Sequence, residues 1–217
     1  MTIRPLIALL ALALPAPAAD IVLLLETGAA MDPVLASTRM PAIPAGDRVA
    51  IMTFAGKPRL RQAFTANWVA LDGTLRRLSA GRMHIGAIAS RPGIPAEAPV
   101  FNANGAACRL FEPGSSRRAV IVLFGSEDYS PAGEAARTVS LAHASLYAVA
   151  VRKMGPPPAG GKARTPPTLP SRAPGSSGMR PLPEATFGTL ADLARASGGA
   201  TASEKLDLAG LFARIGR

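Results

Sequence analysis

The sequence has few of the residues on which catalytic and metal sites depend. It contains one cysteine, Cys108, and two histidines, His84 and His143, in 217 residues. A single cysteine excludes an intrachain disulfide, and its neighbours at helical spacing are small or apolar, so we predict that it packs in the core. Zinc-ligand spacing, a glycine-rich phosphate loop and a dinucleotide fingerprint are also missing. These absences argue against a zinc protein, a nucleotide-binding protein and a disulfide-stabilised protein of the common kinds.

A serine nucleophile is not favoured either. Ser126 follows an apolar run, where a strand-to-helix turn could expose it. The nucleophile elbow needs Gly-x-Ser-x-Gly, and Asp128 stands in place of the second glycine. Neither histidine is a good base, because His84 lies where a loop enters a helix and His143 lies at a helix end. We therefore predict that the protein is not an enzyme. A hydrolase whose site is not recognisable in the sequence is kept as the last of three alternatives, after the two binding functions given below.

The N-terminal segment resembles an export signal. Residues 1–5 carry Arg4, residues 6–14 are apolar, and residues 15–19 supply small side chains for a signal peptidase. Cleavage after Ala18 or Ala19 would start the mature chain at or next to Asp20. The apolar run is shorter than the ~20 residues that span a bilayer, and no later run is long enough. We predict a signal peptide at 1–19 and one periplasmic or secreted domain at 20–217.

Positive charge dominates the sequence, and one segment concentrates it. The formal net charge is +10 and the pI is about 11.1, which favours acidic or anionic partners although solvated arginines also explain it. Residues 155–183 hold nine prolines, five glycines and four basic residues without an acid. We predict a mobile loop there. Nucleic acid is an unlikely partner, because Tyr147 is the one aromatic residue nearby that could stack on a base. An acidic protein or an anionic envelope surface fits better.

Apolar strand patterns alternate with helical ones along the rest of the chain. This alternation predicts an α/β fold with a doubly wound, mostly parallel central sheet flanked by helices. One antiparallel edge strand is expected after the turn at residues 56–58. The predicted strands cover residues 21–25, 48–55, 59–66, 119–124, 145–152 and 200–203. The predicted helices cover residues 31–40, 67–79, 85–90, 100–111, 131–144, 184–197 and 206–215, with Val69, Leu71, Leu75 and Leu78 as the apolar stripe of the second.

Ligands of such sheets bind at the carboxyl ends of the strands. Three features should meet at that edge: residues 26–30, residues 125–128 and the Pro-rich loop. Glu26, Glu127 and Asp128 could hold a divalent cation such as Mg²⁺ or Mn²⁺, but a solvated acidic loop explains them better. Thr27 could cap the helix that follows it.

The order and spacing of these landmarks resemble the von Willebrand factor type A domain, most of all its bacterial secreted versions. The resemblance runs from about residue 20 to residue 215. It rests on residues 21–31, on Gly46-Asp-Arg-Val-Ala-Ile51, on Phe64-Thr65, on Gly81-Arg-Met-His-Ile-Gly-Ala87, and on residues 120–128 and 190–199. It implies a Rossmann-like fold.

The family often carries a metal-ion-dependent adhesion site, and the resemblance implies that this site is degenerate here. The ligand positions fall on Glu26, Gly28, Ala30, Met83 and Gly125. Glu26 alone keeps a side-chain oxygen, whereas Mg²⁺ requires near-octahedral oxygen coordination. We therefore expect no cofactor.

These expectations converge on an exported, non-catalytic protein–protein interaction domain that binds its partner without a metal. Arg82 and the basic loop could present positive charge at the sheet edge in place of the ion. The alternative is a divalent-cation-dependent adhesion domain. The binding residues predicted for this edge are Glu26, Thr27, Arg82, His84, Ser126, Glu127 and Asp128.

Overall fold

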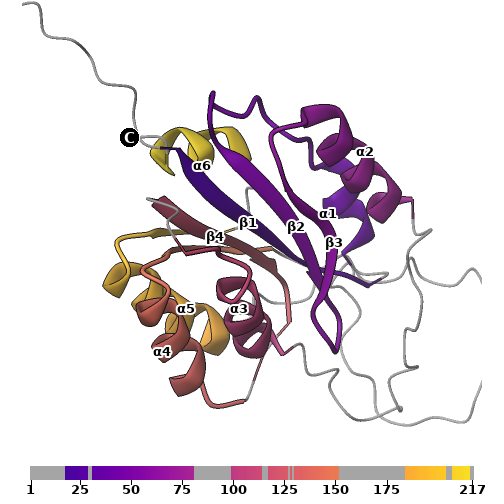
Figure 1. The fold of residues 1–217 in the computed structure, drawn as a ribbon. Coiled ribbons are helices and arrows are strands. Elements are labelled where there is room, and N and C mark those ends of the chain that lie inside the picture. The colour runs from indigo at the N-terminus through magenta and orange to yellow at the C-terminus, as the bar shows by residue number, and fades with distance from the viewer. Residues whose placement is uncertain are drawn as a thin grey trace, which may run out of the picture.

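The computed structural model describes residues 18–28, 31–80, 99–113, 117–126, 128, 130–151, 184–203 and 207–215. Within these ranges a six-stranded sheet has helices on both faces (Figure 1). The strands are β1 (Ala19–Glu26), β2 (Arg48–Phe54), β3 (Arg59–Thr65), β4 (Arg117–Phe124), β5 (Ser145–Ala150) and β6 (Ala200–Ser203). The helices are α1 (Asp32–Ser37), α2 (Trp68–Ser79), α3 (Val100–Cys108), α4 (Gly133–Leu141), α5 (Glu184–Ala196) and α6 (Leu208–Ile215).

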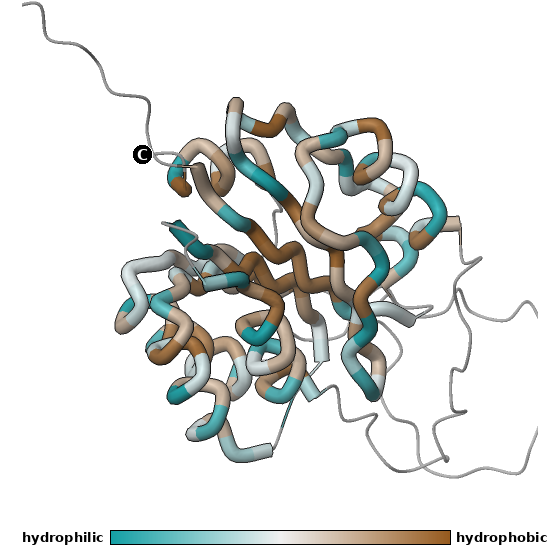
Figure 2. Tube along the Cα trace, viewed as in Figure 1, coloured by the Kyte–Doolittle hydropathy of each residue, from teal (hydrophilic) through white to brown (hydrophobic). Residues whose placement is uncertain are grey.

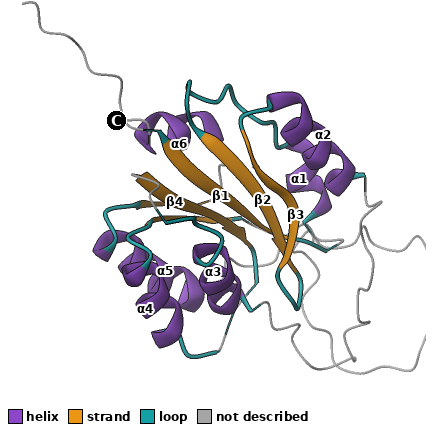
Figure 3. Cartoon of the chain, viewed as in Figure 1, coloured by secondary structure: helices purple, strands orange, loops and turns teal. Residues whose placement is uncertain are grey.

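The sheet confirms the predicted fold class. Its strand order is β3-β2-β1-β4-β5-β6, and every neighbouring pair is parallel except β2 and β3. The predicted antiparallel edge strand is therefore present (Figure 3). The chain passes from β1 to β2 on one side and later places β4 on the other side of β1. The carboxyl ends of β1 and β4 thus flank the topological switch point, where open α/β sheets bind ligands.

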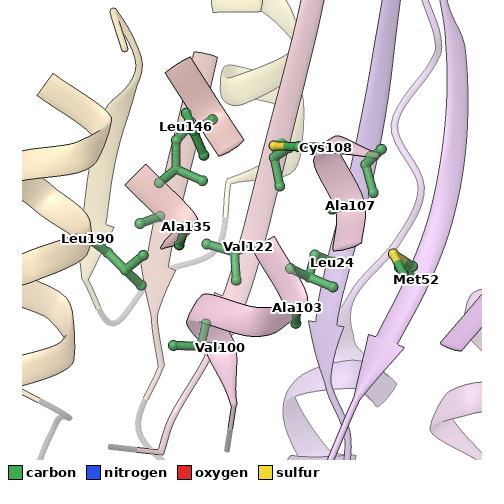
Figure 4. Packing of buried hydrophobic residues seen from close by; sticks show 14 of the residues in the cluster. Leu24, Met52, Val100, Ala103, Ala107, Cys108, Val122, Ala135, Leu146 and Leu190 are labelled. Carbon is green, nitrogen blue, oxygen red and sulfur yellow. The ribbon is translucent and has the colours of Figure 1, made fainter. Parts of the chain in front are cut away.

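Alternating side chains of the central strands fill two separate cores. Figure 2 shows that the central strands are mostly hydrophobic. Val22 and Leu24 of β1 face α3, α4 and α5, whereas Ile21, Leu23 and Leu25 face α1, α2 and α6. Figure 4 draws the first of these cores between the sheet and its covering helices. Because both faces are covered, the central strands are apolar at consecutive positions, as expected for parallel strands.

Several helix boundaries differ from the prediction. The helix expected over residues 31–40 ends at Ser37, because Thr38 is extended and its hydroxyl donates to the carbonyl of Val34 at 2.8 Å. The helix expected over 131–144 begins at Gly133, so Pro131 precedes it and is not in its first turn. Val69 was expected in the buried stripe of α2 but is 72% exposed. The helix expected over residues 85–90 lies outside the described residues.

Other boundaries agree closely. Asn67 caps α2, and its side chain accepts a hydrogen bond from the Ala70 N–H at 3.2 Å. The chain leaves α5 through Gly198, which has a φ of +76°. A Cβ on Gly199 would lie 1.8 Å from the carbonyl oxygen of Leu146, so only glycine lets the chain approach β5 so closely as it enters β6.

Two further predicted segments lie outside the described residues: the leader before residue 18 and the Pro-rich loop at residues 155–183. Within the described part of the chain, no helix combines the length and apolar content needed to cross a membrane.

Candidate functional site

Glu26 lies at the centre of the switch point. It is the last residue of β1, and register pairs it with Phe54 at the end of β2. Its position continues the alternation of Val22 and Leu24, so the side chain projects on the α3 side of the sheet. The residue is 3% exposed. A buried carboxylate at this position requires hydrogen-bond donors, and the neighbouring strand supplies them.

Three donors from the β4 loop surround the Glu26 carboxylate. Its Oε2 accepts from the backbone N–H groups of Gly125 at 2.7 Å and Ser126 at 3.0 Å. Its Oε1 accepts from the Ser126 hydroxyl at 2.6 Å. Two successive backbone N–H groups that converge on one oxygen form an anion-binding nest. Here a side chain of the same chain occupies the nest, so Glu26 joins the carboxyl ends of β1 and β4.

Gly28 occupies the second ligand position of the family's metal site, where the family has a serine. It differs from that serine in backbone conformation as well as in side chain. Gly28 has a φ of +148°, a conformation that side-chain-bearing L residues rarely adopt. A serine placed there would therefore strain the backbone. Gly125, at the last ligand position, offers no side-chain oxygen and uses its N–H for Glu26. Ala30 and Met83 are outside the described residues.

Thr27 links β1 to β2. Its N–H donates to the Phe54 carbonyl at 2.9 Å, and its hydroxyl lies 3.5 Å from the same oxygen. The suggestion that Thr27 caps the following helix is wrong, because α1 begins after Met31 and has no side-chain cap.

Asp128 is also buried, at 7% exposure, and its hydrogen bonds lead away from Glu26. Its Oδ2 accepts from the Phe101 N–H at the start of α3, at 2.9 Å. Its Oδ1 accepts from the Ser130 N–H at 2.9 Å and from the Ser130 hydroxyl. Its own N–H donates to the Thr186 hydroxyl of α5 at 2.7 Å. Asp128 therefore caps α3 and joins the β4 loop to α5, so it is not the solvated acid that the sequence suggested.

The predicted cation site can be compared with these contacts only in part, because Glu127 is outside the described residues. Glu26 and Asp128 direct their oxygens to different backbone groups. No three acidic, histidine or cysteine residues of the described ranges are grouped as metal ligands. Arg82 and His84, which were predicted to line the same edge, are also outside the described residues.

The remaining nucleophile candidates lie in unsuitable surroundings. The Ser126 hydroxyl donates to a carboxylate. His143 lies in the turn after α4, just before β5 begins, and thus at the opposite edge of the sheet from Ser126. Cys108 packs in the core as predicted, and burial raises the pKa of its thiol to about 11. A thiol with so high a pKa is a poor nucleophile at neutral pH.

A basic surface that was not predicted from the sequence lies at the same edge of the sheet as Glu26. The turn from β2 into β3 follows Phe54, so it lies at the carboxyl edge of the sheet (Figure 1). We call its side chains Lys57, Arg59, Leu60 and Arg61 the hairpin surface. Lys57 and Arg59 are exposed, and Leu60 is 47% exposed. The turn predicted at residues 56–58 implies this location, and the basic residues in and after that turn are the sequence signal for the surface.

The hairpin cations have no anionic partner among the described residues. Arg61 instead donates from Nε to the Thr53 hydroxyl at 2.8 Å. Burial, and then the charge of Arg59, lower the pKa of Arg61. Three like charges that meet no acid among the described residues favour the approach of an anionic group.

Comparison with known proteins identifies the fold. No protein-family model and no curated protein matches the sequence. The crystal structure of an aerotolerance-related membrane protein from Bacteroides fragilis NCTC 9343, with multiple mutations to serine, aligns with a TM-score of 0.57 and 14% identity. The alignment covers 91% of this chain and 98% of that one. The conserved hypothetical protein BatB from Bacteroides thetaiotaomicron aligns with a TM-score of 0.54 and 15% identity over 91% and 95% of the chains.

The chain therefore has a von Willebrand factor type A fold, as the resemblance in sequence predicted. At such low identity the similarity establishes the fold and no activity.

Proposed function

We propose that this protein is an exported, non-catalytic interaction domain that binds an acidic protein segment without a metal ion. The observation that carries the proposal is the nest at the switch point. There the Glu26 carboxylate accepts hydrogen bonds from Gly125 and Ser126. The oxygens of an acid held in this way have little freedom to coordinate an ion. Gly28 and Gly125 have no side-chain oxygen that could act as a ligand.

The hairpin surface supplies the charge that a metal would otherwise present. A metal ion in an adhesion site attracts a carboxylate of the partner. At this edge Lys57, Arg59 and Arg61 provide positive charge, and the exposed side chain of Leu60 adds apolar surface. Exposed cations mainly accelerate association and select acidic partners. The predicted basic segment at residues 155–183 would enlarge the same field.

The metal-independence of the fold is testable by thermal unfolding. We expect 10 mM MgCl₂ or MnCl₂, or 5 mM EDTA, to change the Tm by less than about 1 °C. A site with a Kd of 0.1 mM would stabilise the protein by about 2.7 kcal/mol at that concentration, which is roughly 5–10 °C for a domain of this size. A rise of that order, lost in Glu26→Gln, would support the divalent-cation alternative.

Charge reversal at the hairpin tests the binding surface. We expect Lys57→Glu with Arg59→Glu to weaken binding of poly-L-glutamate, and of proteins captured from envelope extracts, by roughly tenfold. Binding by the unaltered protein should weaken as salt is raised from 0.05 to 0.5 M and should not respond to EDTA.

The matched control is Arg137→Glu with Arg214→Glu, which reverses two exposed charges, one on α4 and one on α6. It should change binding less than twofold. Equal losses in the hairpin variant and the control would mean that overall charge drives binding. Binding abolished by EDTA would contradict the proposal.

A further inference from the structure

A buried carboxylate lies at the amino edge of the sheet, opposite the hairpin surface. Asp47 precedes β2 and is 4% exposed. Its Oδ1 accepts a hydrogen bond from the Ala19 N–H at 2.8 Å. Its Oδ2 is buried and has no hydrogen-bond partner among the described residues. Burial of a carboxylate with one satisfied oxygen is costly unless a cation accompanies it.

No neighbouring side chain of the described residues supplies that cation. The adjacent Arg48 turns to Asp20, with Nε and Nη2 each 2.9 Å from a carboxylate oxygen of that residue. Its second ionic contact is to Glu112 at 3.7 Å. Asp47 is therefore buried beside a backbone nitrogen, and no ion pair to it is formed by the part of the chain that the structure describes.

The backbone nitrogen that faces Asp47 coincides with a predicted processing position. Ala19 is the first residue of β1, and its side chain is buried in the core that includes α6. Residues Ala16-Pro17-Ala18 match the small-x-small pattern that precedes a signal-peptidase cut. A cut one residue later would place Pro17 at the outer small-residue position.

We propose that the export signal is removed between Ala18 and Ala19 and that the new α-ammonium group of Ala19 forms a buried ion pair with Asp47. Water hydrolyses the Ala18–Ala19 peptide bond, which leaves a carboxylate on Ala18 and an α-ammonium on Ala19. The ammonium carries three N–H donors where the amide had one, so it can serve Oδ1 and Oδ2 together. Cleavage precedes folding, because folded Ala19 is inaccessible to a peptidase.

The alternative cuts do not complete this contact. A chain that begins at Asp20 has no Ala19, so Asp47 would have neither the Ala19 N–H donor nor a positive charge beside it. A chain that begins one residue earlier, at Ala18, presents Asp47 with a neutral amide. Only the cut after Ala18 places a positive charge at this nitrogen, and Asp47 is already desolvated by the fold around it.

The first test is the N-terminus of the exported protein. The full chain is expressed in a bacterium with a general secretory pathway, and the exported form is analysed by intact mass and N-terminal sequencing. We expect Ala19 with a free amine. A chain that starts at Ala18 or Asp20, or that retains the leader, would overturn the proposal.

The second test measures the ion pair itself in processed chains that start at Ala19 or retain Ala18. Asp47→Asn should lower the Tm of the Ala19 chain by roughly 4–8 °C. It should leave the Tm of the Ala18 chain unchanged or raise it, because there it removes an uncompensated buried charge. The control Asp192→Asn, at an exposed pair on α5, should have little effect on either chain.

Equal losses of Tm in both Asp47→Asn chains would refute the ion pair. If Asp47→Asn does not fold, the unaltered chains still decide the matter. The Ala19 chain should then melt at a higher temperature than the Ala18 chain, and equal melting temperatures would count against the proposal.

Discussion

Replacing Glu26 with alanine should lower the free energy of unfolding by about 3–5 kcal/mol. The substitution removes a buried carboxylate that accepts three hydrogen bonds, from Gly125, Ser126 and the Ser126 hydroxyl. Hydrogen bonds to a charged group contribute about 1.5–3 kcal/mol each, and donors left without an acceptor add a desolvation cost. Water that enters the space would recover part of this loss. Urea denaturation monitored by circular dichroism measures the change.

Two further variants distinguish the bridging role from a general loss of charge. Glu26→Gln keeps the shape of the side chain but directs an amide NH₂ group toward hydrogen-bond donors. Its free energy of unfolding should therefore fall between those of the alanine variant and the unaltered protein. Glu134→Ala removes an acid that is 78% exposed on α4 and should cost less than about 0.5 kcal/mol. A Glu26→Ala protein within 1 kcal/mol of the unaltered one would mean that the carboxylate does not hold β1 and β4 together.

The second large effect is expected at Asp128, where substitution by alanine should lower the free energy of unfolding by about 2–4 kcal/mol. Asp128 accepts the Phe101 N–H at the start of α3 and two hydrogen bonds from Ser130. Loss of a helix cap costs about 1 kcal/mol, and the burial of this carboxylate raises the cost. The cap comes from a residue 27 positions away in the chain, so its loss should loosen the packing of α3 against the β4 loop.

Hydrogen exchange can assign the effect of Asp128 to the cap. In Asp128→Ala the Phe101 amide should exchange much faster, because its acceptor is gone. Thr186→Val removes the acceptor of the Asp128 N–H, costs about 1 kcal/mol and should leave the Phe101 amide protected. Unchanged protection of Phe101 in Asp128→Ala would show that the cap contributes little.

Both acids at the carboxyl edge thus hold the fold together, which changes how this edge is interpreted. Sequence alone grouped Glu26 with Asp128 as possible ligands because strand ends meet there. In the structure the two carboxylates diverge, one toward the β4 nest and the other toward α3. Among the described residues at this edge, the cations of the hairpin surface are therefore the charged groups that we expect a partner to contact.

The sequence by itself determined the strands, their mostly parallel pairing and the antiparallel edge strand. It did so because apolar strand runs and amphipathic helices are local patterns with fixed periods. The resemblance to the von Willebrand factor type A family, and not periodicity, identified Gly28 and Gly125 as positions that lack metal ligands. Local periodicity was less reliable at helix ends and on helix faces. Val69 fits the stripe of α2 yet is exposed, because what packs against a helix depends on distant residues.

Only the tertiary structure decided what the polar groups do. The donors of Glu26 come from residues 99 and 100 positions away, and Asp47 meets Ala19 across 28 positions. Such contacts depend on strand order and register, which no local pattern encodes. An acid followed by small residues has the same local sequence whether it holds a metal, caps a helix or receives a chain terminus. Burial and the placement of donors around each carboxylate distinguish these roles.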